Sequence, residues 1–232
     1  MQLYIFDSCP FCIRVRVLTA IKQISCEETV LLAGDYPTDL VAKVPAITVP
    51  MLAYTDAQGQ EVLMQESIDI LAFLDQQDGQ PLLSNYEGSA KVKDWLAALK
   101  PASSGLTYPR MDALDLAELA SPKAQAFSDM IRPKAVAMSM PEALAKTSEF
   151  VVAVEALFNA ASEVLDVPAL LNGTRQIDID DLLAFADLRN LAIVAELSWP
   201  QALQDYVQFI SEHTAIPMYA KVNQDLAVID ND

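Results

Sequence analysis

Two cysteines near the N-terminus, Cys9 and Cys12 of Cys9-Pro10-Phe11-Cys12, are the residues of this chain best suited to chemistry. They follow a short apolar run and a turn, and this order predicts a strand, a turn and a helix that begins at Pro10. Cys9 then lies at the helix N-terminus, where unpaired N–H groups and the helix dipole stabilise a thiolate, and Cys12 lies one turn further along. We therefore predict a redox pair that can form a disulfide.

Zinc binding and a structural disulfide are the alternative roles for this pair. Structural zinc is almost always bound by four ligands, which usually come as two close pairs, but outside the pair the chain has only one cysteine, Cys26, and one histidine, His213, and no second C-x-x-C or H-x-H cluster. A disulfide across so short a loop contributes little stability, and the sequence shows no secretory signal. We therefore expect no metal site, and we expect Cys26 to be a small core residue.

Basic residues follow the cysteine pair closely. Arg14, Arg16 and Lys22 are three of only four basic residues before Gly79. A cation near Cys9 lowers the pKa of its thiol, so Arg14 and Arg16 are candidates for stabilising the thiolate. A solvated helix face that carries both arginines is the alternative.

The elements that position the pair form the pattern βαβ, then α, then ββα. Two strands joined by a helix of this length predict a parallel pair with a right-handed crossover. The predicted elements are a strand at 2–6, a helix at 10–21, a strand at 26–32, a loop or short helix at 37–44, strands at 49–54 and 61–64, and a helix from residue 66. This half of the chain is therefore predicted to be a small α/β domain.

The rest of the chain is predicted to be helical, because apolar residues recur at helical spacing from 89 to 211 and no stretch is typical of a strand. One helix is expected at 142–165, and another has Asp178 as N-cap and Asp181 at its third position. A hydrophobic content of 53% predicts a sizeable apolar interface between the two halves. The predicted boundaries are an α/β domain at 1–78, a linker at 79–88, an all-helical domain at 89–224 and a frayed acidic tail at 225–232.

The charge of the chain argues against several classes of partner. It has 32 acidic and 15 basic residues, a net charge of −17, which disfavours nucleic acid and anionic membrane surfaces. The longest stretch without a charged residue, 44–55, contains two prolines and is too short to span a membrane. With no signal peptide visible, we expect a monomeric, cytoplasmic protein whose cysteine pair is held as dithiols.

The order of the motifs is similar to that of a known family. The Cys-Pro-x-Cys motif, Val49-Pro50 at the third strand and Glu66-Ser67 at a helix start resemble the glutathione-transferase architecture with a glutaredoxin active site. The runs that resemble the bacterial glutaredoxin 2 family more closely are Leu3-Tyr4-Ile5, the cysteine motif, Gln65-Glu66-Ser67-Ile68-Asp69-Ile70 and Leu188-Arg189-Asn190-Leu191. The resemblance extends to about residue 221, and implies a thioredoxin-like α/β N-terminal domain and an all-α C-terminal domain.

The resemblance implies glutathione-dependent thiol–disulfide exchange. The Cys9 thiolate attacks a protein disulfide or a glutathione mixed disulfide, and Cys12 or free glutathione resolves the intermediate. Glutathione is then the co-substrate, and the partners are proteins that carry a disulfide or a glutathionylated cysteine. Pro10 and Phe11 are assigned to the glutathione site. The family usually has tyrosine where this chain has Phe11, so any hydrogen bond of that hydroxyl is absent, although thiol chemistry does not need it.

The rest of the glutathione site is also implied by the resemblance. In such folds Val49 forms a cis peptide bond with Pro50 and offers its backbone N–H and C=O to the cysteinyl unit of glutathione. Ser67 and nearby N–H groups take the α-carboxylate of the γ-glutamyl end, and Glu66 takes its ammonium group. From the residues alone, an ordinary capped helix start is the alternative for Glu66 and Ser67.

Two other functions share this architecture. A glutathione transferase would combine the same glutathione site with a lone Cys, a Ser or a Tyr and an apolar second-substrate pocket. A non-catalytic binding module would keep the fold alone. The presence of both Cys9 and Cys12 favours the oxidoreductase over either, and leaves open whether one thiol or two carry the reaction.

Overall fold

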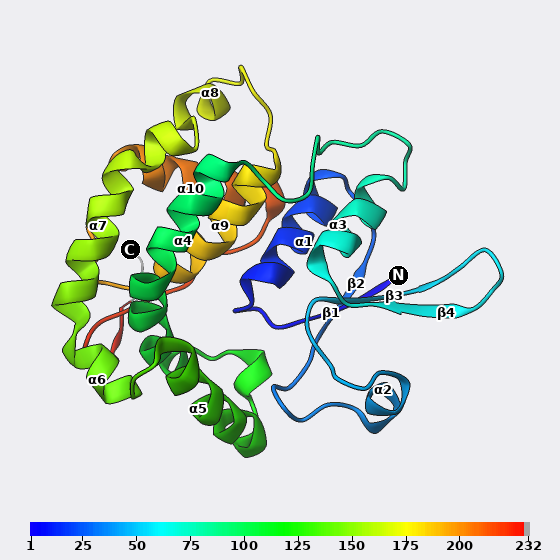
Figure 1. Cartoon of the computed structure of the whole chain (residues 1–232), viewed down its shortest axis with the longest axis horizontal. Helices are drawn as coiled ribbons and strands as arrows, with labels where there is room; N and C mark the ends of the chain where they lie inside the picture. The colour runs from blue at the N-terminus through cyan, green and yellow to red at the C-terminus, as the bar shows by residue number, and fades with distance from the viewer. Residues whose placement is uncertain (230–232) are drawn as a thin grey trace.

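The N-terminal half is a four-stranded mixed sheet with helices on both faces, and the computed structural model describes residues 1–229 in all (Figure 1). The strands are β1 (Gln2–Ile5), β2 (Glu27–Val30), β3 (Met51–Thr55) and β4 (Glu61–Met64), in the order β2-β1-β3-β4. β1 is parallel to β2, as the predicted crossover requires, and antiparallel to β3, which pairs with β4 as a hairpin. The helices are α1 (Pro10–Ile21), α2 (Thr38–Lys43) and α3 (Ser67–Asp75).

Alternation along the strands explains why the sheet is covered on both sides. Leu3 and Ile5 of β1 point into the main core with α1 and α3, whereas Tyr4 packs with Leu40 of α2 and Met51 on the opposite face. Successive side chains of a strand point to opposite faces of the sheet, so apolar residues at consecutive positions of β1 are buried on both faces. The α1 helix is therefore fixed against the sheet, with its N-terminal end at the point where β1 ends.

The C-terminal half is helical, as predicted. Its elements are α4 (Ala90–Thr107), η1 (Tyr108–Ala113), η2 (Ala117–Leu119), α5 (Pro122–Val136), α6 (Met140–Ala145), α7 (Thr147–Val164), α8 (Val167–Leu171), α9 (Ile179–Leu191), α10 (Gln201–Thr214), β5 (Lys221–Val222) and β6 (Val228–Ile229). The α4 and α7 helices pack side by side, and α9 lies between them and α1 (Figure 1). The predicted capping box of α9 is confirmed, with Asp178 as N-cap and Asp181 at the third position.

Two predictions about this half differ from the structure. The single helix expected at 142–165 is two helices, α6 and α7, because the chain leaves helical geometry at Lys146 (φ −94°, ψ 11°). The Thr147 hydroxyl donates to the Leu144 carbonyl (2.7 Å) and accepts from buried Arg110 at this break. The tail expected to be frayed from 225 pairs instead as β6 with β5 up to Ile229, and residues 230–232 lie outside the described part.

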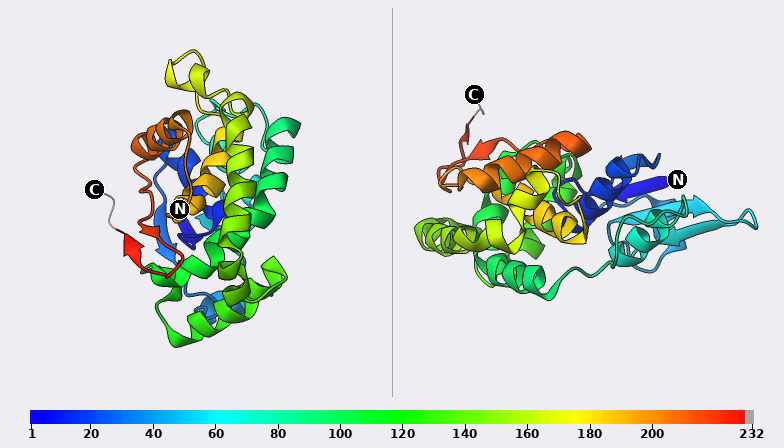
Figure 2. Two further views of the ribbon diagram at one scale, coloured as in Figure 1. Left: turned by 90° about the vertical axis from the view of Figure 1, so that its left-hand side faces the viewer. Right: turned by 90° about the horizontal axis from the view of Figure 1, so that it is seen from above.

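The two halves share one hydrophobic core. Leu3 and Ile13 from the α/β half belong to the same buried cluster as Leu182, Phe185 and Leu188 of α9. The α1 helix packs directly against α9, and Figure 2 shows the two halves in contact along this line. The predicted apolar interface is therefore present. Along residues 1–229, no helix combines the length and the apolar character needed to cross a bilayer.

Candidate active site

Cys9 is the N-cap of α1, and Pro10 is its first helical residue, as predicted. The Cys9 backbone is extended (φ −79°, ψ 116°), and its carbonyl accepts the N–H groups of Cys12 (3.0 Å) and Ile13 (3.1 Å). Cys9 is partly exposed, whereas Cys12, one turn along, is 0% exposed. Both are free thiols of the same helical turn, but only the Cys9 sulfur is accessible, because Cys12 is buried.

The surroundings of the two thiols shift their pKa values in opposite directions. A hydrogen bond from the Cys12 thiol lowers the pKa of Cys9, the backbone N–H groups of Phe11 and Cys12 and the charge of Arg14 add to this, and burial works against it. Burial raises the pKa of Cys12 well above its ordinary value, and its interaction with Cys9 raises it further. These are the shifts that an unpaired helix N-terminus and a buried thiol produce. Cys9 is the thiol that ionises first.

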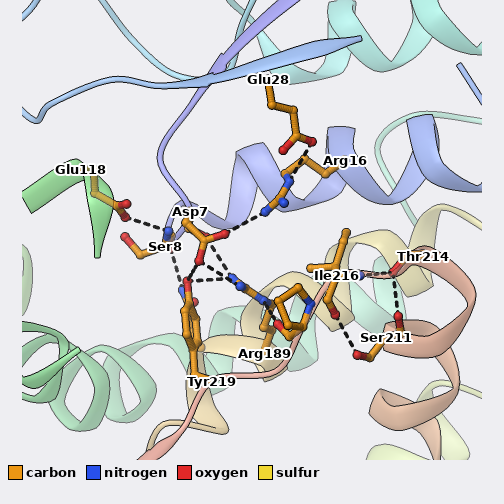
Figure 3. A network of polar contacts seen from close by, with 12 residues as sticks. Asp7, Ser8, Arg16, Glu28, Glu118, Arg189, Ser211, Thr214, Ile216 and Tyr219 are labelled. Atoms are coloured by element: carbon orange, nitrogen blue, oxygen red, sulfur yellow. Dashed lines mark hydrogen bonds and ion pairs between the residues drawn. The ribbon is translucent and has the colours of Figure 1, made fainter. Parts of the chain in front are cut away.

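The structure separates the two arginines that were predicted to stabilise the thiolate. Arg14 lies over the Phe11 ring, 4.6 Å from its centroid, pairs with Asp187 at 3.6 Å, and contributes its charge to Cys9. The Arg16 guanidinium is instead held by Asp7 at 2.8 Å and by a glutamate of β2 at 3.0 Å (Figure 3). The prediction for Arg16 is therefore not supported by its position, since two carboxylates already take up its charge.

The predicted cis peptide bond between Val49 and Pro50 is present. The Cys9 thiol donates to the Val49 carbonyl, with 3.7 Å between Sγ and the oxygen. Pro50 is buried at the start of β3, and Phe11 is 45% exposed beside the cysteine pair. Backbone polar groups of the loop before β3 therefore lie against the sulfur of Cys9.

Glu66 and Ser67 form the start of α3, with Glu66 as an exposed N-cap and Ser67 half-buried. Within the described chain, the Glu66 side chain makes no capping hydrogen bond. Ser67 lines a hollow of about 220 Å³ together with Arg14 and Lys93. Arg14 thus borders both this hollow and the surroundings of Cys9, which brings the start of α3 into the same region as the cysteine pair.

A network of polar groups around buried Arg189, which the residues alone did not indicate, holds the loop before Cys9 (Figure 3). Arg189 of α9 donates to the Asp7 carboxylate at 2.9 Å and to the Asp7 carbonyl at 2.9 Å, and it stacks on Tyr219, 3.9 Å from the ring centroid. The Tyr219 hydroxyl donates to Asp7 at 2.7 Å. Burial raises the pKa of Asp7, but the Arg189 charge and the Tyr219 hydrogen bond outweigh it, so the net pKa is lowered.

Ser8 is also held by the helical half. Its N–H donates to the Glu118 carboxylate at 2.9 Å, and its carbonyl accepts from the Asn190 amide at 2.9 Å. Both side chains are buried, and their partners are 110 and 182 residues away in sequence. Arg189 and Asn190 entered the sequence analysis only within a resembling run, and nothing in the sequence pointed to Glu118.

Cys9 borders a second and larger hollow, of about 430 Å³, between the two halves. Its walls come from the loop before α1, from α4, from the η1 and η2 turns and from α5. Its lining includes Phe11, Tyr108 and Ile131, so the walls are largely apolar. Among residues 1–229, no group of three or more His, Cys, Asp or Glu side chains could hold a metal ion.

Comparison with known proteins matches both halves of the chain. The sequence model "Glutaredoxin 2, C terminal domain" matches residues 91–223, and the model "Glutathione S-transferase, N-terminal domain" matches residues 3–82. Glutaredoxin 2 of Escherichia coli K12 is 30% identical over 224 residues, which are 96% of this chain and 99% of that protein. The chain belongs to the glutaredoxin 2 family.

Solved structures agree with this assignment. Glutaredoxin 2 from Salmonella typhimurium, in complex with glutathione, has a TM-score of 0.81 and 27% identity and covers 94% of this chain and 95% of its own. A glutathione S-transferase from Rhodospirillum rubrum has a TM-score of 0.58 and 17% identity over 94% of this chain and 90% of its own, and shares the fold alone. The predicted fold class is confirmed, and as a member of the glutaredoxin 2 family the chain is a thiol–disulfide oxidoreductase.

Proposed function

We propose that this glutaredoxin 2 family member uses Cys9 as the nucleophile and glutathione as the co-substrate to reduce glutathione mixed disulfides and protein disulfides. One observation carries the proposal: Cys9 caps the N-terminus of α1 and is partly exposed, whereas Cys12, in the same helical turn, is fully buried, and these surroundings lower the pKa of Cys9 and raise that of Cys12. A thiolate is the reactive form in disulfide exchange. At neutral pH, Cys9 therefore attacks, while Cys12 stays protonated and donates its hydrogen bond to Cys9.

The reaction is two successive disulfide exchanges. The Cys9 thiolate attacks the glutathionyl sulfur of a mixed disulfide, the old S–S bond breaks, and the other thiol leaves with the electron pair and takes up a proton. The resulting Cys9–glutathione disulfide is then attacked by a second glutathione thiolate, which returns Cys9 to the thiolate form. With protein disulfides, Cys12, one turn away, attacks the Cys9–protein disulfide and releases the reduced protein; two glutathione thiols then reduce the resulting Cys9–Cys12 disulfide in two exchanges and leave as glutathione disulfide.

Several other positions support a glutathione site on the α/β side of Cys9. The Val49 carbonyl, which belongs to the cis peptide bond with Pro50, lies 3.7 Å from the Cys9 sulfur, as a group that aligns the cysteinyl unit of glutathione would. Glu66 and Ser67 stand at the N-terminus of α3, where free N–H groups favour a carboxylate. We assign the γ-glutamyl end to these two residues, and we assign Pro10, Phe11 and Pro50 to the surface beneath the tripeptide. The Salmonella relative was solved with glutathione bound, which favours this ligand.

The setting that suits this chemistry is a reducing one. Cys9, Cys12 and Cys26 are all free thiols, and disulfides rarely persist in the cytosol. We therefore propose a cytoplasmic, monomeric enzyme that acts on disulfide-containing and glutathionylated proteins. Cys26 is half-buried against the core, where burial raises its pKa, so we give it no part in the reaction.

A comparison of three serine variants tests the proposal. Glutathione-coupled reduction of a small glutathione mixed disulfide is measured for Cys9→Ser, Cys12→Ser and the matched control Cys26→Ser. Cys9→Ser is expected to abolish the activity, whereas Cys12→Ser keeps it and loses activity on substrates that need an intramolecular thiol. The control keeps both activities. Equal losses in the Cys9 and Cys12 variants would contradict the division of labour between the two thiols.

A further inference from the structure

The hollow of about 220 Å³ beside the start of α3 is lined by side chains from both halves of the molecule. Arg14 of α1 and Ser67 of α3 line it from the α/β half. Lys93 of α4, and Glu87 just before this helix, line it from the other half. A ligand group bound at the start of α3 therefore lies within reach of charged side chains that the helical half supplies.

The α3 side of this hollow offers hydrogen-bond donors. Ser67 is the first residue of the helix, and the Glu66 side chain makes no capping hydrogen bond to it. The first N–H groups of a helix have no partner within the helix, and they favour an anionic group, such as a carboxylate, at this end. A carboxylate placed here would still expose its other side to the opposite wall of the hollow.

Lys93 stands on that opposite wall and is only loosely engaged. Among residues 1–229, its ion-pair partner is Glu87, with 3.7 Å between Nζ and Oε2, which is too long for a hydrogen bond. The two side chains are 48% and 76% exposed, and an exposed pair of this kind contributes little stability. Lys93 can therefore exchange Glu87 for a carboxylate of a ligand at small cost.

The charges that line the hollow also favour an anion. Its two cations, Arg14 and Lys93, face a single carboxylate, Glu87, although the whole chain has a net charge of −17. Arg14 lies 3.6 Å from the Asp187 carboxylate, and its Nε has no hydrogen-bond partner in the described chain. A local excess of positive charge next to a helix N-terminus attracts a carboxylate.

We propose that Lys93 is a specificity-determining residue that the helical half contributes to the glutathione site: its ammonium group binds the α-carboxylate of the γ-glutamyl unit, opposite Ser67 and the N–H groups of α3. The inference rests on the proposed function, because it needs glutathione with its γ-glutamyl end at the start of α3. The carboxylate is then held between a helix N-terminus and a cation, so the enzyme selects thiols that carry this group.

Two mixed disulfides that differ in one group test this selection. The first joins glutathione to 2-mercaptoethanol, and the second replaces the γ-glutamyl unit by a 4-aminobutyryl unit, which keeps the amine and lacks the α-carboxylate. The sulfur that is attacked and the thiol that leaves are the same in both, so their intrinsic rates of exchange are matched. The kcat/KM for each compound is measured, and the wild type is expected to prefer the glutathione compound.

Lys93→Met is the decisive variant, because it keeps the apolar stem of the side chain and removes its charge. The kcat/KM for the glutathione compound should fall about fivefold, the effect expected for the loss of one partly exposed ion pair. For the 4-aminobutyryl compound it should change by less than about 1.5-fold, because that compound has no carboxylate to lose a partner. Lys93→Arg keeps the charge and should keep the preference of the wild type.

Two further variants serve as controls. Lys91→Met removes a charge from the same helix, but Lys91 lines neither hollow and donates to the Glu163 carbonyl at 3.3 Å, so the preference should stay unchanged. Glu87→Gln removes the ion-pair partner of Lys93 and should not reduce the preference. If Glu87→Gln reduced it as strongly as Lys93→Met does, the effect would belong to the ion pair, and the proposal would be overturned.

The remaining outcomes are equally decisive. If Lys93→Met lowered kcat/KM for both compounds equally, or changed neither, Lys93 would not bind the α-carboxylate, and the proposal would be wrong. A wild type that shows no preference between the compounds overturns it without any variant. Failure of the proposed function looks different: the wild type would then reduce neither compound, or Cys9→Ser would reduce both as well as the wild type does.

Discussion

The two sides of Cys9 are built from different material. On the side formed by the α/β half, backbone groups contact or face the sulfur: the N–H groups at the start of α1 and the carbonyl of Val49, 3.7 Å away. The side formed by the helical half consists of buried side chains, Glu118, Arg189 and Asn190, which hold the loop before Cys9. The reactivity of the Cys9 thiol therefore depends on residues close to it in sequence, whereas its position depends on residues more than one hundred positions away.

The strongest test of this comparison removes the buried arginine that holds the loop. Arg189 is 1% exposed and binds Asp7 through both its carboxylate and its carbonyl. Arg189→Met should lower the free energy of unfolding by about 2 kcal/mol, because it removes the charge-assisted hydrogen bonds of a buried guanidinium to the partly exposed Asp7 carboxylate. Urea unfolding measures this loss. Alkylation of Cys9 at neutral pH should also become slower, since the loop before Cys9 loses its main support.

Arg110→Met is the matched control. Arg110 is 0% exposed and pairs with Glu196 at 3.1 Å, but its contacts lie within the helical half. Its loss should destabilise the fold to a similar extent and leave the alkylation rate of folded Cys9 unchanged. If both variants slowed alkylation equally, the effect of Arg189 on Cys9 would follow from general loosening of the fold, and the comparison would be wrong.

The N-cap of α9 differs from the N-cap of α1: its pKa is raised, whereas that of Cys9 is lowered. Burial and the neighbouring Asp181 charge raise the pKa of Asp178, the N-cap of α9, to about 6. The folded state therefore binds a proton that the unfolded state has already released between pH 4 and 6, so this group lowers the stability as pH rises through that range. Asp178→Asn should gain stability relative to the wild type from pH 4.5 to 6.5, and no further above. Urea unfolding across this range measures the difference; a constant difference would contradict the raised pKa.

A smaller effect separates the two arginines of α1. Arg14 contributes its charge to Cys9, whereas Arg16 is held by Asp7 and Glu28. Arg14→Met should raise the pKa of Cys9, read as the midpoint of alkylation rate against pH. Arg16→Met is the matched variant and should leave that midpoint in place. An equal shift in both variants would show that a general loss of positive charge near α1 governs the thiol.

The sequence predicted the local part of this site well. Pro10 at the first helical position and the Cys-x-x-C spacing depend on neighbouring residues alone, so they placed Cys9 at a helix N-terminus correctly. The cis bond before Pro50 came from the family resemblance, and the structure contains it. Arg16 was named as a candidate because it lies close to Cys9 in sequence, and in the structure Asp7 and Glu28 pair with its guanidinium, which the sequence did not indicate.

The long-range part could not be predicted in the same way. Glu118 lies in a short turn with no periodic pattern around it, and its partner Ser8 is 110 residues away. A single sequence carries no record of such pairings, because burial of one polar side chain against a distant backbone group leaves no local signal. The break between α6 and α7 was missed for the same reason, since Thr147 at the break is bound by Arg110 from a different element.

The most direct test of the account is the pH dependence of Cys9 alkylation, with the modified residue identified by mass spectrometry. We predict that Cys9 reacts first, with a midpoint below the value of about 8.5 for a free cysteine, and that Cys12 stays unmodified in the folded protein. Cys12→Ala should raise the midpoint, because the hydrogen bond from Cys12 is the largest cause of the lowered pKa of Cys9. A wild-type midpoint at the free value, or modification of Cys12 before Cys9, would contradict the account.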